Sequence, residues 1–325
     1  MSGKVFLTGG AGFIGERLAF ALANDGYAVH IVDNLMRGKK DARIEKLEAR
    51  CNVKFYEGDL LQPNTLDSLE SDYDFVIHFA SIVGVQNVSD RPYQTLRENV
   101  LMQDAVIRFA TRQASLTRIL FASTSEVYAG SLLHLGLPLP TPENTALALP
   151  DLSEPRTSYM LSKLYGEAML LHSGLPYTIV RPHNVYGPRM GMGHVIPQLL
   201  QKAHNAEADS TLEVYSVDHK RCFCYIDDAV EMLLRLLKAD AARRQVLNLG
   251  AEAPEVTMQE LAELVIEIVG KRLRIVPKPA TPGSPSRRLP DMTRTRGIAD
   301  YSAQTSLQDG IRSTYEWYKL HEFNV

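Results

Sequence analysis

A glycine-rich turn near the N-terminus constrains the fold of this chain more than any other feature. Residues 5–8 are apolar or β-branched, and the sequence Gly9-Gly10-Ala11-Gly12-Phe13-Ile14-Gly15 follows them directly. Glycines at positions Gly9, Gly12 and Gly15 allow a tight turn, a close approach of backbone N–H groups to a diphosphate, and close packing of the following helix. A purely structural turn is the alternative. The spacing favours a dinucleotide-binding unit, with Phe13 and Ile14 at the start of its helix.

Short apolar runs alternate with amphipathic segments through the first half of the chain, which is typical of parallel strands joined by helices. Strands are predicted over residues 5–8, 28–32, 53–56, 75–78, 119–122 and 178–180. Helices are predicted over residues 12–24, 41–50, 63–69, 92–113 and 157–172. The strands are nearly all apolar, so both faces of the sheet are expected to be covered. We predict an α/β fold: a Rossmann-type doubly wound parallel sheet with a smaller mixed α/β C-terminal substrate domain.

The regular alternation weakens after Arg181, where glycines and prolines crowd into residues 182–193. Helices are then predicted over residues 195–206, 227–239 and 257–269, and strands over 212–215 and 246–249. Thr257 and Glu260 form a capping-box pattern, and the proline-rich residues 277–290 read as a loop. The expected domains are a cofactor domain over residues 1–181, to which 222–250 return, and a substrate domain over 182–221 and 251–325.

The composition argues against several classes of partner. The chain has 35 basic and 38 acidic residues and a formal net charge of −3, which argues against nucleic acid or a polybasic membrane anchor as a partner. No apolar run approaches the roughly 18 residues of a membrane span, and the N-terminal run is too short for a signal peptide. The three cysteines form no C-x-x-C pair and are expected to be free thiols. We expect a cytoplasmic location and no metal site.

Asp33 ends the second predicted strand. A carboxylate there accepts hydrogen bonds from the adenosine ribose hydroxyls and repels a 2′-phosphate, so NAD is predicted as the cofactor. Arg37 is near enough in sequence to keep NADP as an alternative. Asp59 and Leu60 follow the third strand and either border the adenine or begin the next helix.

A tyrosine and a lysine, Tyr159 and Lys163, lie one turn apart on one face of a predicted helix. A lysine cation nearby lowers a tyrosine pKa, which suits a base that takes a proton from a substrate hydroxyl. Alone, this spacing is more often structural. It gains weight because residues 123–126, Ser-Thr-Ser-Glu, follow the fifth strand at the sheet edge where ligands bind.

With these motifs in order, the chain closely resembles the extended short-chain dehydrogenase/reductase family, the NAD-dependent nucleotide-sugar epimerases, dehydratases and decarboxylases. The motifs that carry the resemblance are Gly9 to Gly15, Asp33-Asn34, Gly58-Asp59-Leu60, His78-Phe79-Ala80-Ser81, Ser123 to Tyr128, Tyr159 to Lys163, and Arg181 to Arg189. The resemblance implies that bound NAD oxidises the sugar, usually at C4, and that the hydride returns after a step at C5 or C6 or a reorientation of the ketone. It also implies a UDP-linked nucleotide-sugar substrate and a homodimer.

The resemblance assigns roles to matching residues. It implies that Tyr159 is the base for hydride abstraction, that Lys163 holds the nicotinamide ribose, and that Thr124 bonds the sugar oxygen being oxidised. The implied substrate ligands are Asn184, Arg189, Arg221, Arg288 and Asp291. The implied cofactor ligands beyond the glycine motif are Asp33, Asn34, Asp59, Leu60, Phe79, Ala80, Ser81 and Asn99.

Glu126 helps to choose among the family's reactions. Simple 4-epimerases tend to carry a small hydroxyl residue at this position, whereas dehydratases and decarboxylases tend to carry an acid. A carboxylate there can remove the C5 proton beside a 4-ketone. The 4,6-dehydratases have Asp immediately before this Glu, where this chain has Ser125. The string Thr-Ser-Glu with Gly187-Pro188-Arg189-Met190 looks most like the UDP-glucuronate decarboxylases.

Decarboxylation of UDP-glucuronate is therefore the leading prediction. A UDP-sugar 4-epimerase and an NDP-sugar dehydratase stay as alternatives, because Ser162, His183 and residues 129–158 depart from the decarboxylase pattern. A catalytically silent protein that binds NAD or a nucleotide sugar is a further alternative. The joint presence of Thr124, Glu126, Tyr159 and Lys163 favours an enzyme.

Overall fold

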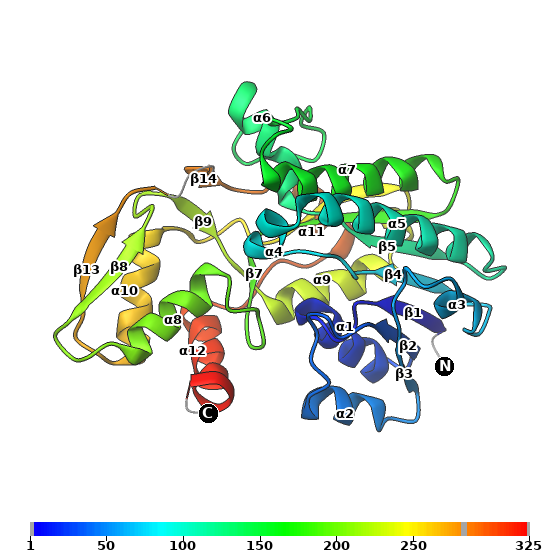
Figure 1. The fold of residues 1–325 in the computed structure, drawn as a ribbon, viewed down its shortest axis with the longest axis horizontal. Coiled ribbons are helices and arrows are strands. Elements are labelled where there is room, and N and C mark those ends of the chain that lie inside the picture. The colour runs from blue at the N-terminus through cyan, green and yellow to red at the C-terminus, as the bar shows by residue number, and fades with distance from the viewer. Residues whose placement is uncertain (1–2, 281–284, 324–325) are drawn as a thin grey trace.

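A seven-stranded parallel sheet forms the centre of the molecule (Figure 1). The structure is a computed structural model that describes residues 3–280 and 285–323. The strand order is β11-β6-β5-β4-β1-β2-β3, and every pair is parallel. The strands are β1 Lys4–Thr8, β2 Ala28–Asp33, β3 Val53–Glu57, β4 Phe75–His78, β5 Arg118–Ala122, β6 Tyr177–Pro182 and β11 Gln245–Leu249. The order reverses between β1 and β4, and ligands bind at such a switch point.

Helices cover both faces of this sheet, as the apolar strands predict. Alternating side chains of one strand enter different cores: Val5 and Leu7 pack on the side of α1 and α9, whereas Phe6 packs on the side of α5 and α7. Figure 1 shows these two helix layers on opposite sides of the strands. The helices beside the sheet are α1 Phe13–Asn24, α2 Ala42–Glu48, α3 Pro63–Asp67, α4 Val85–Asp90, α5 Pro92–Thr111, α7 Pro155–His172 and α9 Ile226–Lys238.

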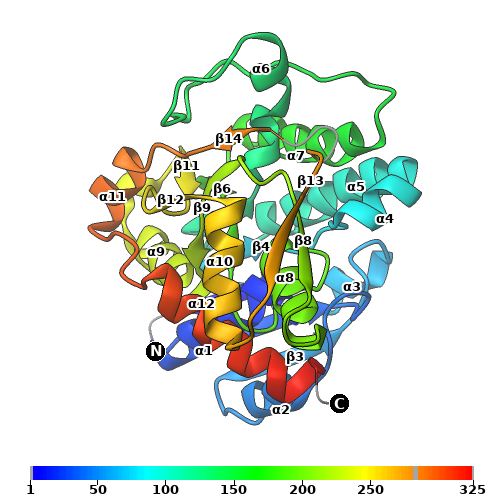
Figure 2. The ribbon, with the colours of Figure 1, turned by 90° about the vertical axis from the view of Figure 1, so that its left-hand side faces the viewer.

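A second group of elements extends from the carboxyl edge of the sheet, and Figure 2 views the molecule from this end. It contains three small sheets, pairing β7 with β10, β8 with β13, and β9 with both β12 and β14. Its helices are α8 Val195–Asn205, α10 Met258–Val269, α11 Thr293–Ala299 and α12 Leu307–Tyr318. Its strands are β7 Val185–Tyr186, β8 Thr211–Tyr215, β9 Lys220–Cys222, β10 Cys224–Tyr225, β12 Glu255–Thr257, β13 Arg274–Lys278 and β14 Arg287–Arg288. The core between these elements is continuous with the core on the α1 side of the sheet.

The predicted fold class is confirmed, and the predicted elements of the first half lie within a few residues of the observed ones. The capping box of Thr257 and Glu260 is present at the start of α10. The short elements were not predicted from the sequence, among them α4, the 3₁₀ helix η1 Ser125–Tyr128, and α6 Ala129–His134. The predicted loop over residues 277–290 was partly wrong, because its ends belong to β13 and β14; residues 281–284 lie outside the described part. The proposed domain boundaries stay a prediction, although β11 joins the main sheet.

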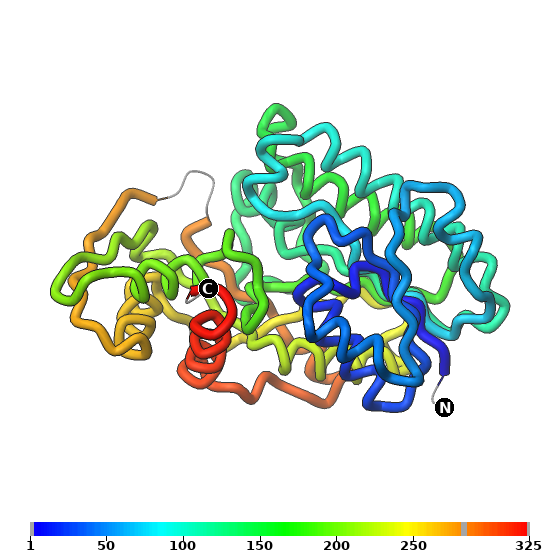
Figure 3. The backbone as a smooth tube through the Cα atoms, turned by 60° about the horizontal axis from the view of Figure 1, so that its bottom comes forward, coloured from blue at the N-terminus to red at the C-terminus, as the bar shows by residue number. Residues whose placement is uncertain are grey.

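One chain crossing brings distant segments together at the carboxyl edge of the sheet. The segment after α6 reaches the stretch that follows β14, where Thr141 forms a bridge with Pro290 and donates its N–H to the oxygen of Leu289. The tube in Figure 3 shows how segments from both halves of the chain converge in the middle of the molecule. Within residues 3–280 and 285–323, no helix has the length and apolar character needed to span a membrane.

Candidate active site

The turn after β1 has no room for side chains. Gly9 has a φ of +74°, and a Cβ there would lie 2.5 Å from the backbone nitrogen of Ala80. A Cβ at Gly15 would collide with the carbonyl oxygen of Gly9. Gly12 is the N-cap of α1, so no side chain covers the first N–H groups of this helix. An open helix N-terminus beside a bare backbone turn fits the diphosphate of a dinucleotide, which agrees with the role predicted for Phe13 and Ile14 at the same helix start.

Asp33 ties the end of β2 to this turn. Its Oδ2 accepts the N–H of Ala11 and its Oδ1 accepts the N–H of Leu35, both at 2.9 Å. Burial raises the pKa of Asp33, and these two hydrogen bonds oppose the increase. A carboxylate has about four acceptor positions, so two remain for ribose hydroxyls. The charge of Arg189 also opposes the increase of the Asp33 pKa. A carboxylate at this position would repel the 2′-phosphate of NADP, which supports NAD.

The other predicted cofactor residues lie at the same edge of the sheet. Asn34 accepts the N–H of Met36 through its side chain, and Asp59 accepts the N–H of Leu61, while Leu60 is buried. Phe79 donates its N–H to the oxygen of Thr8, and Ala80 donates to the Thr8 hydroxyl. Asn99 holds the next turn, because its Oδ1 accepts from Ser81 and Ile82 and its amide donates to Ser162. The structure therefore gathers these residues at β1, β2, β3 and β4.

Tyr159 and Lys163 project from α7 toward the end of β5. Lys163 donates to the carbonyl oxygen of Ala122 at 2.8 Å, and burial lowers its pKa to about 7, opposed by the charge of Glu167. Burial raises the pKa of Tyr159, and a hydrogen bond with Thr124 and the charge of Arg37 oppose this increase. The Nζ atom of Lys163 lies 5.8 Å from the centre of the Tyr159 ring, so the two side chains share one face of α7, as the helix spacing predicts.

Glu126 lies in η1, next to this group, and two arginines contact its carboxylate. Arg288 Nη1 is 2.8 Å from Oε1, and Arg156 Nη2 is 3.5 Å from Oε2. Burial would raise the pKa of Glu126, but the charges of Arg288, Arg156 and Arg221 together lower it. The site therefore holds three guanidinium groups around one ionised carboxylate. Ser125 is buried directly beside it.

Three predicted substrate residues already have partners within the chain. The Asn184 amide donates to the oxygen of Cys222, and the Asp291 carboxylate accepts the N–H of Thr293. Arg221 donates to the oxygens of Lys220 and Pro285. These bonds hold β9 and the start of α11 in place, and the predicted contacts with a substrate stay predictions.

Arg189 also lies apart from the Glu126 group. Its Nε contacts Asp41 at 2.7 Å, and its two terminal nitrogens donate to the oxygens of Ala11 and Lys39 at 2.9 Å. The side chain, predicted as a substrate ligand, is thus engaged in holding the glycine turn and the segment after β2 together.

One residue of the site, Arg156, and one contact, the ion pair of Glu126 with Arg288, were not predicted from the sequence. Arg156 lies one turn before Tyr159 on α7, so the spacing that links Tyr159 to Lys163 could have included it. No local pattern points to the pairing of Glu126 with Arg288, which depends on the return of the chain through β14. Beneath the site, Arg181 forms a buried ion pair with Glu167 at 2.8 Å.

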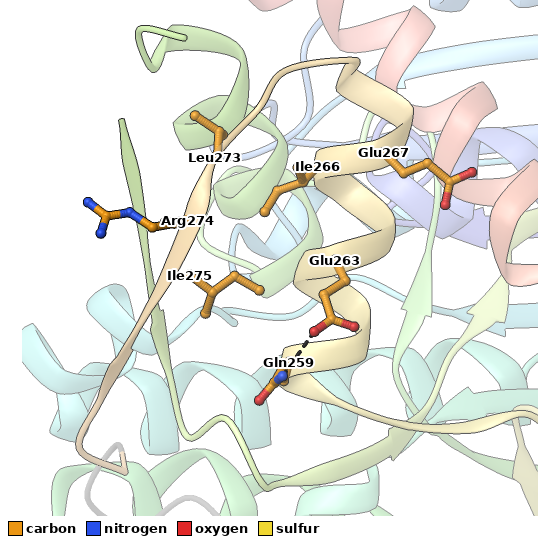
Figure 4. A pocket seen from close by; sticks show the side chains of 7 residues that line it. All are labelled: Gln259, Glu263, Ile266, Glu267, Leu273, Arg274 and Ile275. Carbon is orange, nitrogen blue, oxygen red and sulfur yellow. Dashed lines mark hydrogen bonds between the residues drawn. The ribbon is translucent and has the colours of Figure 1, made fainter. Parts of the chain in front are cut away.

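A surface pocket of about 470 Å³ lies elsewhere, between α10 and β13 (Figure 4). Its lining residues are Gln259, Glu263, Ile266, Glu267, Leu273, Arg274 and Ile275. None of the predicted site residues is among them. Within the described part of the chain, no cluster of three or more His, Cys, Asp or Glu residues could hold a metal ion.

Comparisons with known proteins agree with this geometry. The model of the NAD dependent epimerase/dehydratase family matches residues 5–250. The chain is 30% identical to a UDP-N-acetyl-alpha-D-glucosaminuronate decarboxylase of Bacillus cytotoxicus, covering 98% of both chains. It is 29% identical to UDP-glucuronic acid decarboxylase 5 of Arabidopsis thaliana, covering 98% of this chain and 89% of that protein.

A solved structure matches over nearly the same length. The UDP-glucuronic acid 4-epimerase of Bacillus cereus, in complex with UDP-glucuronic acid and NAD, superimposes with a TM-score of 0.83 at 25% identity, covering 98% of this chain and 99% of that one. The resemblance to the extended short-chain dehydrogenases/reductases is confirmed, and NAD is the cofactor of these enzymes. The chain belongs to the NAD-dependent epimerase/dehydratase family.

Proposed function

We propose that this enzyme decarboxylates a UDP-linked hexuronate, with UDP-glucuronate as the first candidate, through a transient 4-keto sugar. The observation that carries the proposal is the ion-paired state of Glu126. A carboxylate held by Arg288 and Arg156 has a lowered pKa and is a weak base. Dehydration requires a base for the C5 proton, whereas loss of carbon dioxide from a 3-oxo acid does not. The curated relatives named above, both decarboxylases, support the same choice.

NAD, when bound, would supply the exchange of a hydride with C4 of the sugar. Tyr159 would take the proton from the C4 hydroxyl and later return it, while Thr124 orients that oxygen. Lys163 would hold the nicotinamide ribose and stabilise the tyrosinate. The glycine turn (Gly9, Gly12, Phe13, Ile14 and Gly15), Asp33, Asn34, Asp59, Leu60, Phe79, Ala80, Ser81 and Asn99 would bind the cofactor.

The arginines around Glu126 would bind the anionic groups of the substrate. Each guanidinium offers a planar set of donors that matches a carboxylate or a phosphate. Once the 4-ketone is present, the bond between C5 and C6 breaks, carbon dioxide leaves, and its bonding electrons pass to the ketone as an enolate. Cations beside the site would stabilise this negative charge. A proton would then add at C5 to give a 4-keto pentose. Return of the hydride to C4, and of the proton from Tyr159 to the C4 oxygen, would complete the pentose.

The decisive experiment is a product assay with NAD and UDP-glucuronate. We expect release of carbon dioxide and formation of a UDP-pentose. NMR and mass spectrometry would identify the products. UDP-N-acetylglucosaminuronate is tested in parallel, because a relative named for that sugar is 30% identical. A C4 epimer that retains its carboxylate would favour the epimerase alternative, loss of water the dehydratase, and binding of both ligands without turnover the silent protein.

We also propose the domain division and the dimer expected from the sequence. Residues 1–181 with 222–250 would form the cofactor domain, and 182–221 with 251–325 the substrate domain. The helices α5 and α7 pack against each other and expose large apolar side chains, namely Tyr93, Leu101, Tyr165 and Leu171, which supports a homodimer across these helices. Light scattering after gel filtration would measure the mass. The expected cytoplasmic location stays a prediction.

A further inference from the structure

Arg37 lies in the segment that joins β2 to α2, and its neighbours fix this segment to the glycine turn. The next residue, Gly38, packs so tightly that a Cβ there would lie 2.5 Å from the Cβ of Ala11. Arg189 donates to the oxygen of Lys39 and pairs with Asp41. The backbone that carries Arg37 is therefore held against the turn that faces the predicted diphosphate.

The guanidinium of Arg37 extends from there toward the catalytic tyrosine. Its Nη2 lies 3.9 Å from the place that a Cβ on Gly84 would take and 3.6 Å from the corresponding place on Gly191. The positive charge of Arg37 acts on the phenol of Tyr159 and on the imidazole of His194, and it opposes the increase of the Tyr159 pKa. One side chain thus connects the glycine turn with the Tyr159 end of the site.

This guanidinium has no partner within the described part of the chain. Among residues 3–280 and 285–323, no hydrogen bond or ion pair to Arg37 is formed, and the side chain is exposed to solvent. Nearby protein nevertheless desolvates the group enough to lower its pKa. Arginine has five N–H donors and stays charged, and a partly desolvated cation without an acceptor is unfavourable. The arrangement is suited to an anionic ligand.

We propose that Arg37 is a ligand of a diphosphate that lies between the glycine turn and Tyr159. This inference rests on the proposed function only in taking diphosphate-bearing ligands to occupy the site. The planar guanidinium can donate paired, charge-assisted hydrogen bonds to phosphate oxygens. The diphosphate of the cofactor is the nearer source, because the backbone of Arg37 lies on the turn that receives it; the diphosphate of the nucleotide sugar is the second source.

The assignment differs from the role that sequence suggested for Arg37. An arginine after β2 can hold the 2′-phosphate of NADP, and this was the alternative that the sequence left open for Arg37. The Nη2 atom of Arg37 lies beside Gly84 and Gly191 instead. Arg37 would therefore bind phosphates common to NAD and NADP, and it would not select between them.

The test is calorimetric titration of the wild type and the Arg37→Gln variant with NADH, ADP-ribose, UDP and UDP-glucuronate. Loss of charge-assisted bonds predicts an affinity about tenfold or more weaker. Weaker NADH and ADP-ribose binding supports the cofactor as the source, and weaker UDP and UDP-glucuronate binding alone supports the substrate. Arg37→Lys should restore part of the affinity. Unchanged affinity for all four ligands would overturn the proposal.

Lys40→Gln provides the matched control, because Lys40 lies in the same segment and pairs with Glu48 at 3.1 Å. It removes the same charge and should leave all four affinities near those of the wild type. An equal loss in Lys40→Gln would also overturn the proposal, because it would indicate a general charge effect. The carbon dioxide assay separates the two proposals. If the wild type releases no carbon dioxide but its NADH affinity depends on Arg37, only the proposed function is refuted.

Discussion

The carboxylate of Glu126 lies 2.8 Å from the guanidinium of Arg288, although one residue follows β5 and the other lies in β14. The pair forms at the carboxyl edge of the sheet, beside the hydrogen bond between Tyr159 and Thr124. Glu126 therefore has two effects: it holds Arg288 at the site, and it places a negative charge among three cations. Holding Arg288 at the site favours turnover. The negative charge weakens the binding of an anionic substrate.

Glu126→Gln is expected to lower kcat for carbon dioxide release by about 10²-fold, because Arg288 would no longer be held in its position and small displacements of site groups have costs of this size. The KM should stay the same or fall, because a negative charge has been removed beside an anionic substrate. Steady-state kinetics with UDP-glucuronate measure both constants. Glu255→Gln is the control, since it breaks the neighbouring pair with Arg287 and should change neither. A kcat equal to that of the wild type would exclude Glu126 from the mechanism.

Tyr159→Phe is expected to abolish turnover, by at least about 10³-fold, because the phenol is the only group placed to exchange a proton with the C4 oxygen in the proposed mechanism. Binding of NADH and UDP should be almost unchanged, since the ring keeps its shape. Calorimetry and the carbon dioxide assay provide the two readouts. A variant that retains its activity would assign the base to another residue.

Lys163→Met should stabilise the fold while it inactivates the enzyme. Burial lowers the pKa of Lys163 from 10.5 to about 7, so the unfolded chain binds the proton more tightly. The folded state loses stability as the pH falls from 10.5 to 7, at most about 5 kcal/mol by the size of the shift. The gain from Lys163→Met should be largest at or below pH 7 and shrink as the pH rises. Urea unfolding between pH 6 and 9 measures it; a gain that grows with pH would contradict this account.

His183→Phe should make the protein more resistant to acid. Burial lowers the pKa of His183 from 6.5 to about 3, so the imidazole costs stability as the pH falls from 6.5 toward 3 and nothing above 6.5. The Asn248 oxygen that contacts it still accepts from the Tyr128 hydroxyl in the variant. Melting temperatures at pH 4 and pH 8 give the comparison, with the exposed His172→Gln as control. Equal differences at both pH values would count against this explanation.

Two glycine substitutions should differ in their effects: Gly15→Ala should weaken NADH binding, whereas Gly297→Ala should stabilise the fold. Gly15→Ala brings a Cβ onto the oxygen of Gly9, whereas Gly297→Ala, in α11, meets nothing within 4 Å. Overpacking costs about 1–3 kcal/mol, so Gly15→Ala should weaken NADH binding about 10- to 100-fold. Gly297→Ala should raise the free energy of unfolding by up to about 1 kcal/mol and leave NADH binding unchanged. Calorimetry and urea unfolding measure the two quantities. If Gly15→Ala binds NADH normally, the glycine turn is not the diphosphate site.

The sequence predicted features that depend on local spacing. Gly9 to Gly15 determine a turn and a helix start, and Tyr159 and Lys163 share a helix face whatever the tertiary structure. The contact of Glu126 with Arg288 had no such signal, because β14 reaches the site only through its pairing with β9 and the bridge of Thr141 with Pro290. The same holds for Arg37, whose direction depends on the packing of Gly38 against Ala11.

Because of Arg189, the order of the glycine turn depends on a residue that the chain supplies only after the sixth strand. Its three hydrogen-bonding nitrogens contact Asp41, Ala11 and Lys39, all of which belong to the unit that runs from the turn after β1 to the N-cap of α2. During synthesis that unit would leave the ribosome well before its anchor does. The proposed cofactor domain is therefore not expected to fold as a separate unit: a fusion or a truncation that ends it at Arg181 would lose this anchor as well as the edge strand β11.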